Sequence, residues 1–91
     1  MRGLVERLDQ QTARTVEQRL AALLLDRHAA ARGQPFPLAR TQAEAAEELG
    51  TVREVLVRTL RRFRETGLVE SPTRGRYRVR DPKGMVRLAE R

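Results

Sequence analysis

The hydrophobic residues between positions 15 and 67 recur at intervals of three and four, the spacing of helices that bury one face. Three helices are predicted in this stretch, each opened by a capping box, in which a hydroxyl at the N-cap is followed three residues later by Glu or Gln. A glycine follows the last turn of each helix. The boxes begin at Thr15, Thr41 and Thr51, and the glycines are Gly33, Gly50 and Gly67, with the first helix running to about Ala31.

Each predicted helix has a set of residues that share one face and form its expected core contact. Between the first two helices, Pro35 and Pro37 forbid helix and impose an extended crossing, which Phe36 and Leu38 are expected to anchor. The core faces are Leu20, Leu23 and Leu24 in the first helix, Ala45, Ala46 and Leu49 in the second, and Val55, Leu56, Thr59, Leu60 and Phe63 in the third.

After Gly67 the spacing changes to an alternation of two, which predicts a β-hairpin. Residues 68–71 are expected as the first strand, 72–75 as the turn and 76–80 as the return strand. Alternate residues of a strand lie on opposite faces, so the return strand is expected to place Tyr77 and Val79 on one face and Arg76, Arg78 and Arg80 on the other.

These elements predict a mainly α fold with a small β-hairpin wing, a winged helix-turn-helix. Residues 15–91 form the domain, with 41–67 as its helix-turn-helix and 68–80 as its wing. A short terminal helix over 83–91 is expected to use Met85, Val86, Leu88 and Ala89. At 91 residues the chain is long enough for one such domain, which buries roughly 60–65% of its unfolded surface.

Charge is segregated along the chain. Residues 1–50 hold seven arginines and seven acids, whereas residues 51–91 hold twelve basic and five acidic residues and account for the whole net charge of +7. A neutral half followed by a basic half indicates a face that binds an anionic partner. The alternative is a solvated surface in an arginine-rich proteome, which would explain why Lys83 is the one lysine but does not explain the segregation.

The chain lacks the residues that several function classes need. It has no cysteine, which excludes disulfides, zinc–thiolate sites and iron–sulfur clusters. His28 is the single histidine and has only Asp26 beside it, and no nucleophile–base pair stands out, so neither metal-binding nor catalytic residues are predicted. No apolar run approaches the roughly 20 residues of a membrane span, and the N-terminus lacks a signal-peptide pattern. We therefore expect a cytoplasmic protein with no membrane partner.

The third helix concentrates arginine opposite its core face, on Arg53, Glu54, Val57, Arg58, Arg61 and Arg64. Glu54 offsets Arg58 one turn later by only a few tenths of a kcal/mol, so this face favours an anionic partner over an ordinary solvated surface. The second helix of a helix-turn-helix enters the major groove, which predicts double-stranded DNA as the partner. The arginines on the outer face of the wing, for which no acidic partner is expected, would then contact phosphate.

The same residues resemble the DNA-binding domain of the cyclic-AMP receptor protein / fumarate–nitrate regulator (Crp/Fnr) family. The likeness covers nearly the whole chain, and its Arg-Glu-x-x-x-Arg pattern is fairly specific. It rests on Thr15-Val16-Glu17 with Arg19-Leu20-Ala21, on Leu49-Gly50, Arg53-Glu54, Arg58, Leu60, Phe63 and Gly67-Leu68-Val69, and on Asp81 with Leu88-Ala89.

This resemblance implies that Arg53, Glu54 and Arg58 read bases in the TGTGA-like half-sites of a palindromic operator. The chemistry agrees, because arginine can pair with guanine O6 and N7, and glutamate can accept from cytosine N4. Val57 stands where the family has a small or polar residue, and is expected to meet a thymine methyl. Phosphate contacts are expected from Arg40, Thr41, Gln42, Thr51, Arg61, Arg76 and Arg78. Arg78→Ala should therefore weaken binding to all DNA sequences by the same factor.

Other expectations follow from the family pattern. Val52 stands where serine or threonine is usual, so Thr51 is expected to take over the helix cap. Residues 1–14 resemble the tail of a dimerisation helix, and we expect a fragment that lacks the sensory domain. No cofactor is therefore expected in this chain, since an effector such as a cyclic nucleotide would bind the absent domain.

The expected partners are DNA, a second copy of the protein and RNA polymerase. The full-length protein should be a homodimer, but the seam in residues 1–14 is too short for a stable coiled coil, so this chain should be a monomer or weak dimer. The loop Arg32–Pro37 is a polymerase-contact site by family analogy alone. The alternatives are a GntR-type or other winged-helix DNA binder, and a winged helix used for protein contact.

Overall fold

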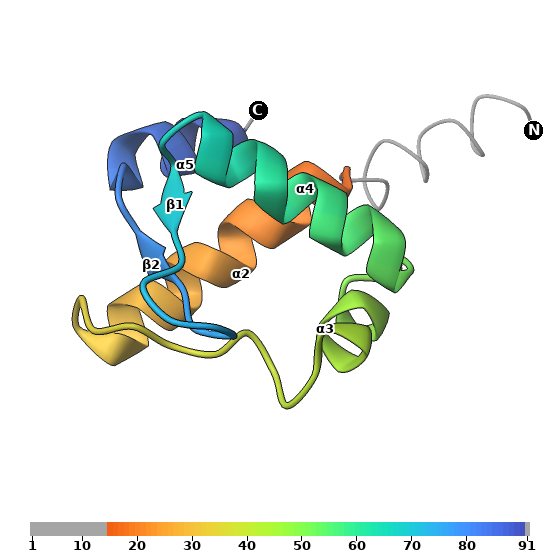
Figure 1. Ribbon diagram of the computed structural model, residues 1–91. Coiled ribbons are helices and arrows are strands. Elements are labelled where there is room, and N and C mark those ends of the chain that lie inside the picture. Colours follow the sequence, from red (N-terminus) through yellow and green to blue (C-terminus); the bar gives the residue numbers. More distant parts are fainter. Residues whose placement is uncertain (1–14, 91) are drawn as a thin grey trace, which may run out of the picture.

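The computed structural model describes residues 15–90; residues 1–14 and 91, among them the predicted tail of a dimerisation helix, lie outside the described part. The elements follow in the order of a winged helix-turn-helix, so the predicted fold class is confirmed (Figure 1). They are α2 (Val16–Ala31), α3 (Gln42–Glu48), α4 (Arg53–Glu65), β1 (Val69–Glu70), β2 (Arg78–Val79) and α5 (Pro82–Glu90).

Of the three predicted capping boxes, one forms completely and a second forms only its hydroxyl cap. At the start of α2 the capping box is complete, because the N–H of Gln18 donates to the Thr15 hydroxyl at 3.1 Å and the Thr15 N–H donates to the Gln18 side chain at 2.9 Å. At the start of α3 the Thr41 hydroxyl accepts from the N–H of Glu44 at 3.0 Å. Hydroxyl caps therefore fix where these two helices begin.

The third predicted cap is wrong. Helix α4 begins at Arg53 with Val52 as its N-cap, and no side chain bonds to its first N–H groups. Thr51 belongs instead to the end of α3, because its N–H donates to the Ala46 carbonyl at 2.9 Å while the N–H of Gly50 donates to Glu47 at 3.0 Å. These two bonds form a Schellman motif. Thr51 is thus one residue too early to cap α4.

The turn between α3 and α4 is held by Gly50 and by an arginine from α2. Gly50 has a φ of +72°, which a residue with a side chain rarely adopts. The Arg19 guanidinium donates from Nη1 to the Leu49 carbonyl at 3.1 Å, and a Cβ added to Gly50 would lie only 3.0 Å from that nitrogen. The angle between α3 and α4 is therefore fixed by the backbone of the turn and also by Arg19 of α2.

The wing is shorter than predicted, with β1 and β2 paired over two residues each. Val69 lies opposite Val79, and Glu70 lies opposite Arg78. The predicted faces are confirmed: Tyr77 and Val79 are buried, whereas the arginines of the return strand are partly or fully exposed.

The proline-flanked crossing also pairs with the wing. Phe36 and Tyr77 exchange two backbone hydrogen bonds, of 2.9 and 2.8 Å. Pro35 and Pro37 keep this segment out of a helix, so the N–H and carbonyl of Phe36 have no helical partners and can pair with Tyr77. Phe36 and Leu38 were predicted to anchor this extended crossing, and both are buried.

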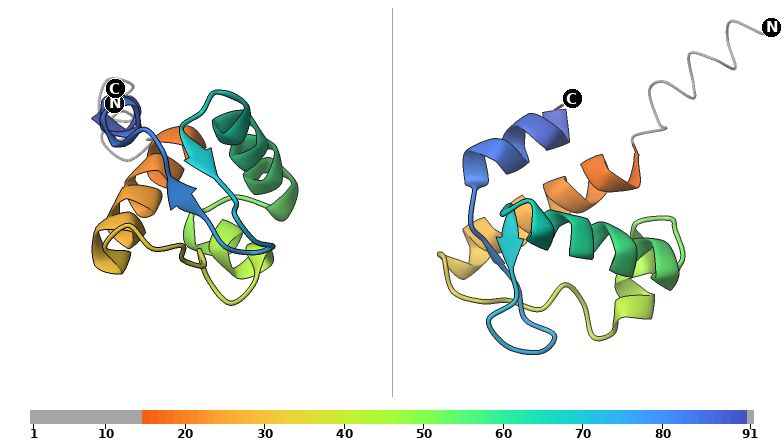
Figure 2. Two further views of the ribbon diagram at one scale, coloured as in Figure 1. Left: turned by 60° about the vertical axis from the view of Figure 1, so that its left-hand side comes forward. Right: turned by 45° about the horizontal axis from the view of Figure 1, so that its top comes forward.

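Helix α5 packs along α2 and closes the fold (Figure 2). It opens at Pro82, one residue before the predicted start, and the carboxylate of Asp81 accepts from the N–H of Gly84 at 3.0 Å. Met85 and Ala89 are buried, but Val86 is 39% exposed and its predicted packing is wrong. Val86 lies one residue past Met85, about 100° around the helix and therefore away from α2.

The core is assembled around α2, which packs against α5, β2 and α4, while α3 packs on α4. Leu23 and Val55, predicted as core, are only partly buried, and Leu23 packs against the edge of the core. The buried hydrophobic residues are Leu20, Ala21, Leu24, Phe36, Leu38, Ala45, Ala46, Leu49, Leu56, Leu60, Phe63, Val69, Tyr77, Val79, Met85 and Ala89.

Candidate nucleic-acid interface

Helix α4 separates a buried face from an arginine-rich outer face, as its periodicity predicts. Leu56, Leu60 and Phe63 are buried, and Thr59 joins them with its hydroxyl donating to the Val55 carbonyl at 2.7 Å. A buried hydroxyl needs such a partner. The outer face consists of Arg53, Glu54, Arg58, Arg61 and Arg64, all exposed, and of the partly exposed Val57.

The arginines of this outer face have no acidic partner among residues 15–90. Glu54 and Arg58 lie one turn apart on the same helix, yet no ion pair joins them. Arg62 is different, because it pairs with Glu17 of α2 and so holds α4 against α2. The outer face therefore presents four cationic groups and one carboxylate that are free to meet a ligand.

A shallow depression of about 320 Å³ gathers the predicted base-reading residues. It lies between the start of α3 and the outer face of α4, and Gln42 is the α3 residue that lines it. Its other lining residues are Arg53, Glu54, Val57, Arg58 and Arg61. The structure thus brings together all four residues predicted to read bases and two of those predicted to contact phosphate.

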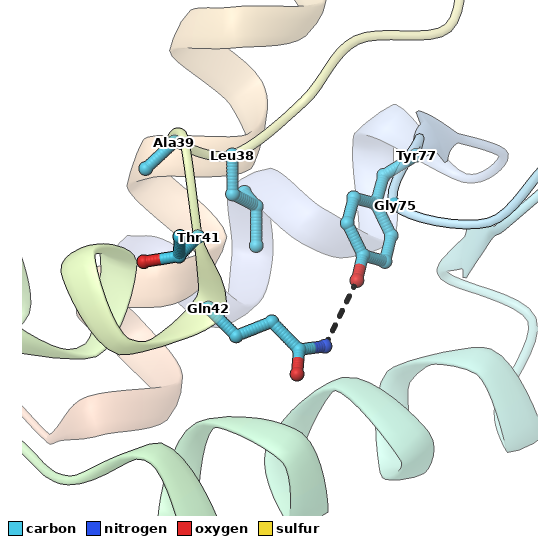
Figure 3. A pocket seen from close by; sticks show the side chains of 6 residues that line it. All are labelled: Leu38, Ala39, Thr41, Gln42, Gly75 and Tyr77. Carbon is cyan, nitrogen blue, oxygen red and sulfur yellow. Dashed lines mark hydrogen bonds between the residues drawn. The ribbon is translucent and has the colours of Figure 1, made fainter.

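Gln42 also connects this depression to the wing. Its amide Nε2 lies 3.5 Å from the Tyr77 hydroxyl, and the two side chains point toward each other (Figure 3). They border a small, largely apolar hollow of about 70 Å³ that is also lined by Leu38, Ala39, Thr41 and Gly75. The wing tip, the start of α3 and the outer face of α4 therefore adjoin.

The remaining predicted phosphate contacts lie in different settings. Arg40 and Thr41 are exposed immediately before α3, and Thr51 is partly buried in the turn before α4. Arg76 is exposed near the wing tip and has no ion pair within the described residues. Of these, Thr51 is the least accessible.

The expectation that the wing arginines lack acidic partners is wrong. Glu70 accepts from Nε of Arg78 at 2.8 Å, and a second nitrogen of Arg78 bonds to the same oxygen. Nε of Arg80 lies 3.5 Å from the other carboxylate oxygen. A four-residue turn at 72–75 would place Glu70 opposite Tyr77, but the wider loop observed places it opposite Arg78. The ion pair depends on this register, which residue spacing alone does not show.

The part of the chain that the structure describes contains no cluster of three or more side chains able to hold a metal ion. His28 lies at the end of α2, and its buried Nδ1 has no hydrogen-bond partner. Among the same residues, no helix is long and apolar enough to cross a membrane.

Comparisons with known proteins point to one family. The family model described as the Crp-like helix-turn-helix domain matches residues 18–88. Among solved structures, a protein from Eubacterium rectale ATCC 33656 assigned to the Crp/Fnr family of transcriptional regulators is similar, with a TM-score of 0.76 and 28% identity over 92% of this chain. The chain spans 38% of the length of that protein. No curated protein matches this sequence.

Proposed function

The chain belongs to the Crp-like helix-turn-helix family, a family of DNA-binding domains of transcriptional regulators, and from this premise we propose that it reads an operator through the outer face of α4. The observation that supports the proposal most is the depression that gathers Arg53, Glu54 and Arg58 with Gln42. Exposed guanidinium groups without acidic partners are suited to bind the acceptor atoms of a duplex.

In this proposal, the first two turns of α4 lie in the major groove and contact base edges. Arg53 and Arg58 pair with guanine O6 and N7, Glu54 accepts from cytosine N4, and Val57 packs on a thymine methyl. The expected half-site is TGTGA-like, by the Arg-Glu-x-x-x-Arg pattern of the family. Val57 is partly exposed and lines the depression, where a methyl group could reach it.

Phosphate contacts surround this face on two sides. Arg40, Thr41 and Gln42 lie before and at the start of α3, Thr51 precedes α4 and Arg61 lies two turns into α4. On the wing, Arg76 is the better contact and Arg78 the weaker, because Glu70 already holds Arg78. Such contacts fix the register of the protein on the duplex without reading sequence.

Two copies would bind a palindrome, with their recognition helices about 34 Å apart in successive major grooves. The effector would bind another domain of a longer regulator, and the loop Arg32–Pro37 would contact RNA polymerase. Both proposals rest on analogy with the family. The second candidate function, a winged helix that binds protein through the same face, has no observation in its favour.

Binding to any duplex distinguishes these two functions. Binding of the 91-residue chain to labelled duplex DNA can be followed by fluorescence anisotropy over roughly 50 to 200 mM salt. The logarithm of the binding constant should fall linearly with the logarithm of the salt concentration. Each neutralised phosphate contributes a slope of about 0.9. A protein-interaction module would show little binding and no such slope, which would overturn the proposed function.

A further inference from the structure

We infer that Glu70 limits how strongly the wing binds the DNA backbone, by holding Arg78 and Arg80 away from phosphate. The inference rests on the proposed function, since it concerns duplex binding. It assigns a role to an acidic residue that is not among the proposed base-reading or phosphate-contacting residues. Glu70 is thus a positioning residue that acts through two arginines.

The geometry uses both oxygens of the carboxylate. Glu70 lies directly opposite Arg78 in the hairpin, where side chains on one face of a sheet are close enough to interact. Arg78 donates two bonds to Oε2, the one from Nε at 2.8 Å. Nε of Arg80 lies 3.5 Å from Oε1. One carboxylate therefore offsets part of the charge of two guanidinium groups.

The pairing is reversible because none of the three side chains is buried. Their exposed fractions are 31% for Glu70, 41% for Arg78 and 63% for Arg80. A phosphate could reach either guanidinium group, but it would have to compete with a carboxylate that is already in contact. Glu70 thus lowers the readiness of these two arginines to bind phosphate without blocking them sterically.

The other two wing arginines are not restrained in this way. Arg74 and Arg76 are exposed near the wing tip and form no ion pair within the described residues. Glu70 is the one acidic residue between Thr66 and Arg80 in the sequence. The wing therefore has two free arginines at its tip and two restrained arginines at its base.

This division matters most on random DNA. Binding to non-specific duplex comes almost entirely from phosphate neutralisation, whereas binding to an operator also uses the base contacts of α4. Release of Arg78 and Arg80 would add phosphate contacts on any sequence. Glu70 therefore keeps the non-specific affinity of the domain low while the base-reading face is unchanged.

Glu70→Gln tests the inference, because it removes the charge and keeps the shape of the side chain. Affinity for a random-sequence duplex is measured against salt for the 91-residue chain. The variant should bind several-fold more tightly at low salt, with a logarithmic slope steeper by about 1 to 2, as expected for one or two added phosphate contacts. Glu90→Gln, which changes net charge equally at the exposed end of α5, should leave the slope unchanged.

A mutant cycle shows whether Glu70 acts through the arginines. In a chain that already has Arg78→Ala and Arg80→Ala, Glu70→Gln should no longer steepen the slope. Equal behaviour of Glu70→Gln and Glu90→Gln, weaker binding by Glu70→Gln, or persistence of its effect without the arginines would each overturn the inference. If the unmodified chain itself shows no salt-dependent binding, the proposed function fails first.

Discussion

Two sets of arginines in this domain differ in what their guanidinium groups contact. Arg62, Arg78 and Arg80 face carboxylates of other elements. Arg53 and Arg58 have no acidic partner among residues 15–90 and lie in one depression. Arg53 and Arg58 form no ion pair within the described residues, and even exposed pairs contribute only about 0–1 kcal/mol to stability. Both arginines can therefore be replaced with little effect on folding.

Arg53→Ala and Arg76→Ala should therefore change DNA binding in different ways. Loss of a bidentate contact to guanine should cost Arg53→Ala about 1–3 kcal/mol on its best sequence and relax preference at one base position. Arg76→Ala should weaken all sequences alike and reduce the salt slope by about 0.9. Anisotropy titrations with an operator and a scrambled duplex separate the two. Equal losses on both duplexes for both variants would contradict this division of roles.

For single residues, the sequence predicts which face of a helix or strand a side chain lies on better than it predicts which side chain it contacts. The 3.6-residue period of α4 correctly placed Leu56 and Phe63 in the core and Arg58 outside it. The Glu70–Arg78 ion pair was missed, because it depends on the hairpin register and hence on the width of a loop. Periodicity is a property of one segment, whereas a salt bridge between strands depends on how two segments are aligned.

At the level of elements, the start of α4 lacks the side-chain cap that α2, α3 and α5 have. Val52 occupies the N-cap with backbone angles typical of that position, φ −109° and ψ 160°, but offers no hydrogen-bond acceptor. Its side chain is 62% exposed, so it contributes little packing in return. The first N–H groups of the proposed recognition helix thus lack a side-chain cap.

Val52→Ser should supply that cap and stabilise the domain. Serine at an N-cap is worth about 0.5–2 kcal/mol relative to alanine, which raises the melting temperature of a domain of this size by about 4–8 °C per kcal/mol. Thermal unfolding followed by circular dichroism measures the melting temperatures of Val52→Ser and Val52→Ala. Both variants lose the exposed valine side chain, so the difference between their melting temperatures reports the serine cap alone. If the two variants melt at the same temperature, Val52 is not the N-cap.

The ends of helices could be predicted where a residue can play only one part, as a glycine does after the last turn. They could not be predicted where one residue could either end one helix or cap the next. Gly50 and Gly67 were expected to end helices, and both have positive φ angles, of +72° and +79°. Thr51 was expected to cap α4, but its backbone completes the end of α3 instead. Two helices joined by so short a turn compete for the same residues, and the sequence does not show which helix takes them.

In the whole molecule, the basic second half of the sequence supplies one side of the structure with most of its positive charge. The elements that supply most of the excess positive charge are α4 and the wing, and α4 packs on β1 of the wing. Gln42 of α3 lies between them, because it lines the depression on α4 and faces Tyr77 of the wing. Helices α2 and α5 pack together and support them (Figure 2). The sequence predicted this arrangement by resemblance to a family, but the pairing of Phe36 with Tyr77, which fixes the wing against the crossing, had no signal in hydrophobic spacing.

A selection of bound sequences from a random duplex pool tests most directly whether the outer face of α4 reads bases. The unmodified chain, Arg58→Ala and Arg64→Ala are compared, since base contacts come from the N-terminal part of a recognition helix and Arg64 lies at the other end of α4. We predict enrichment of a TGTGA-like half-site by the unmodified chain and by Arg64→Ala, with preference lost at one position for Arg58→Ala. A pool that stays random, or one motif enriched equally by all three proteins, would contradict the account.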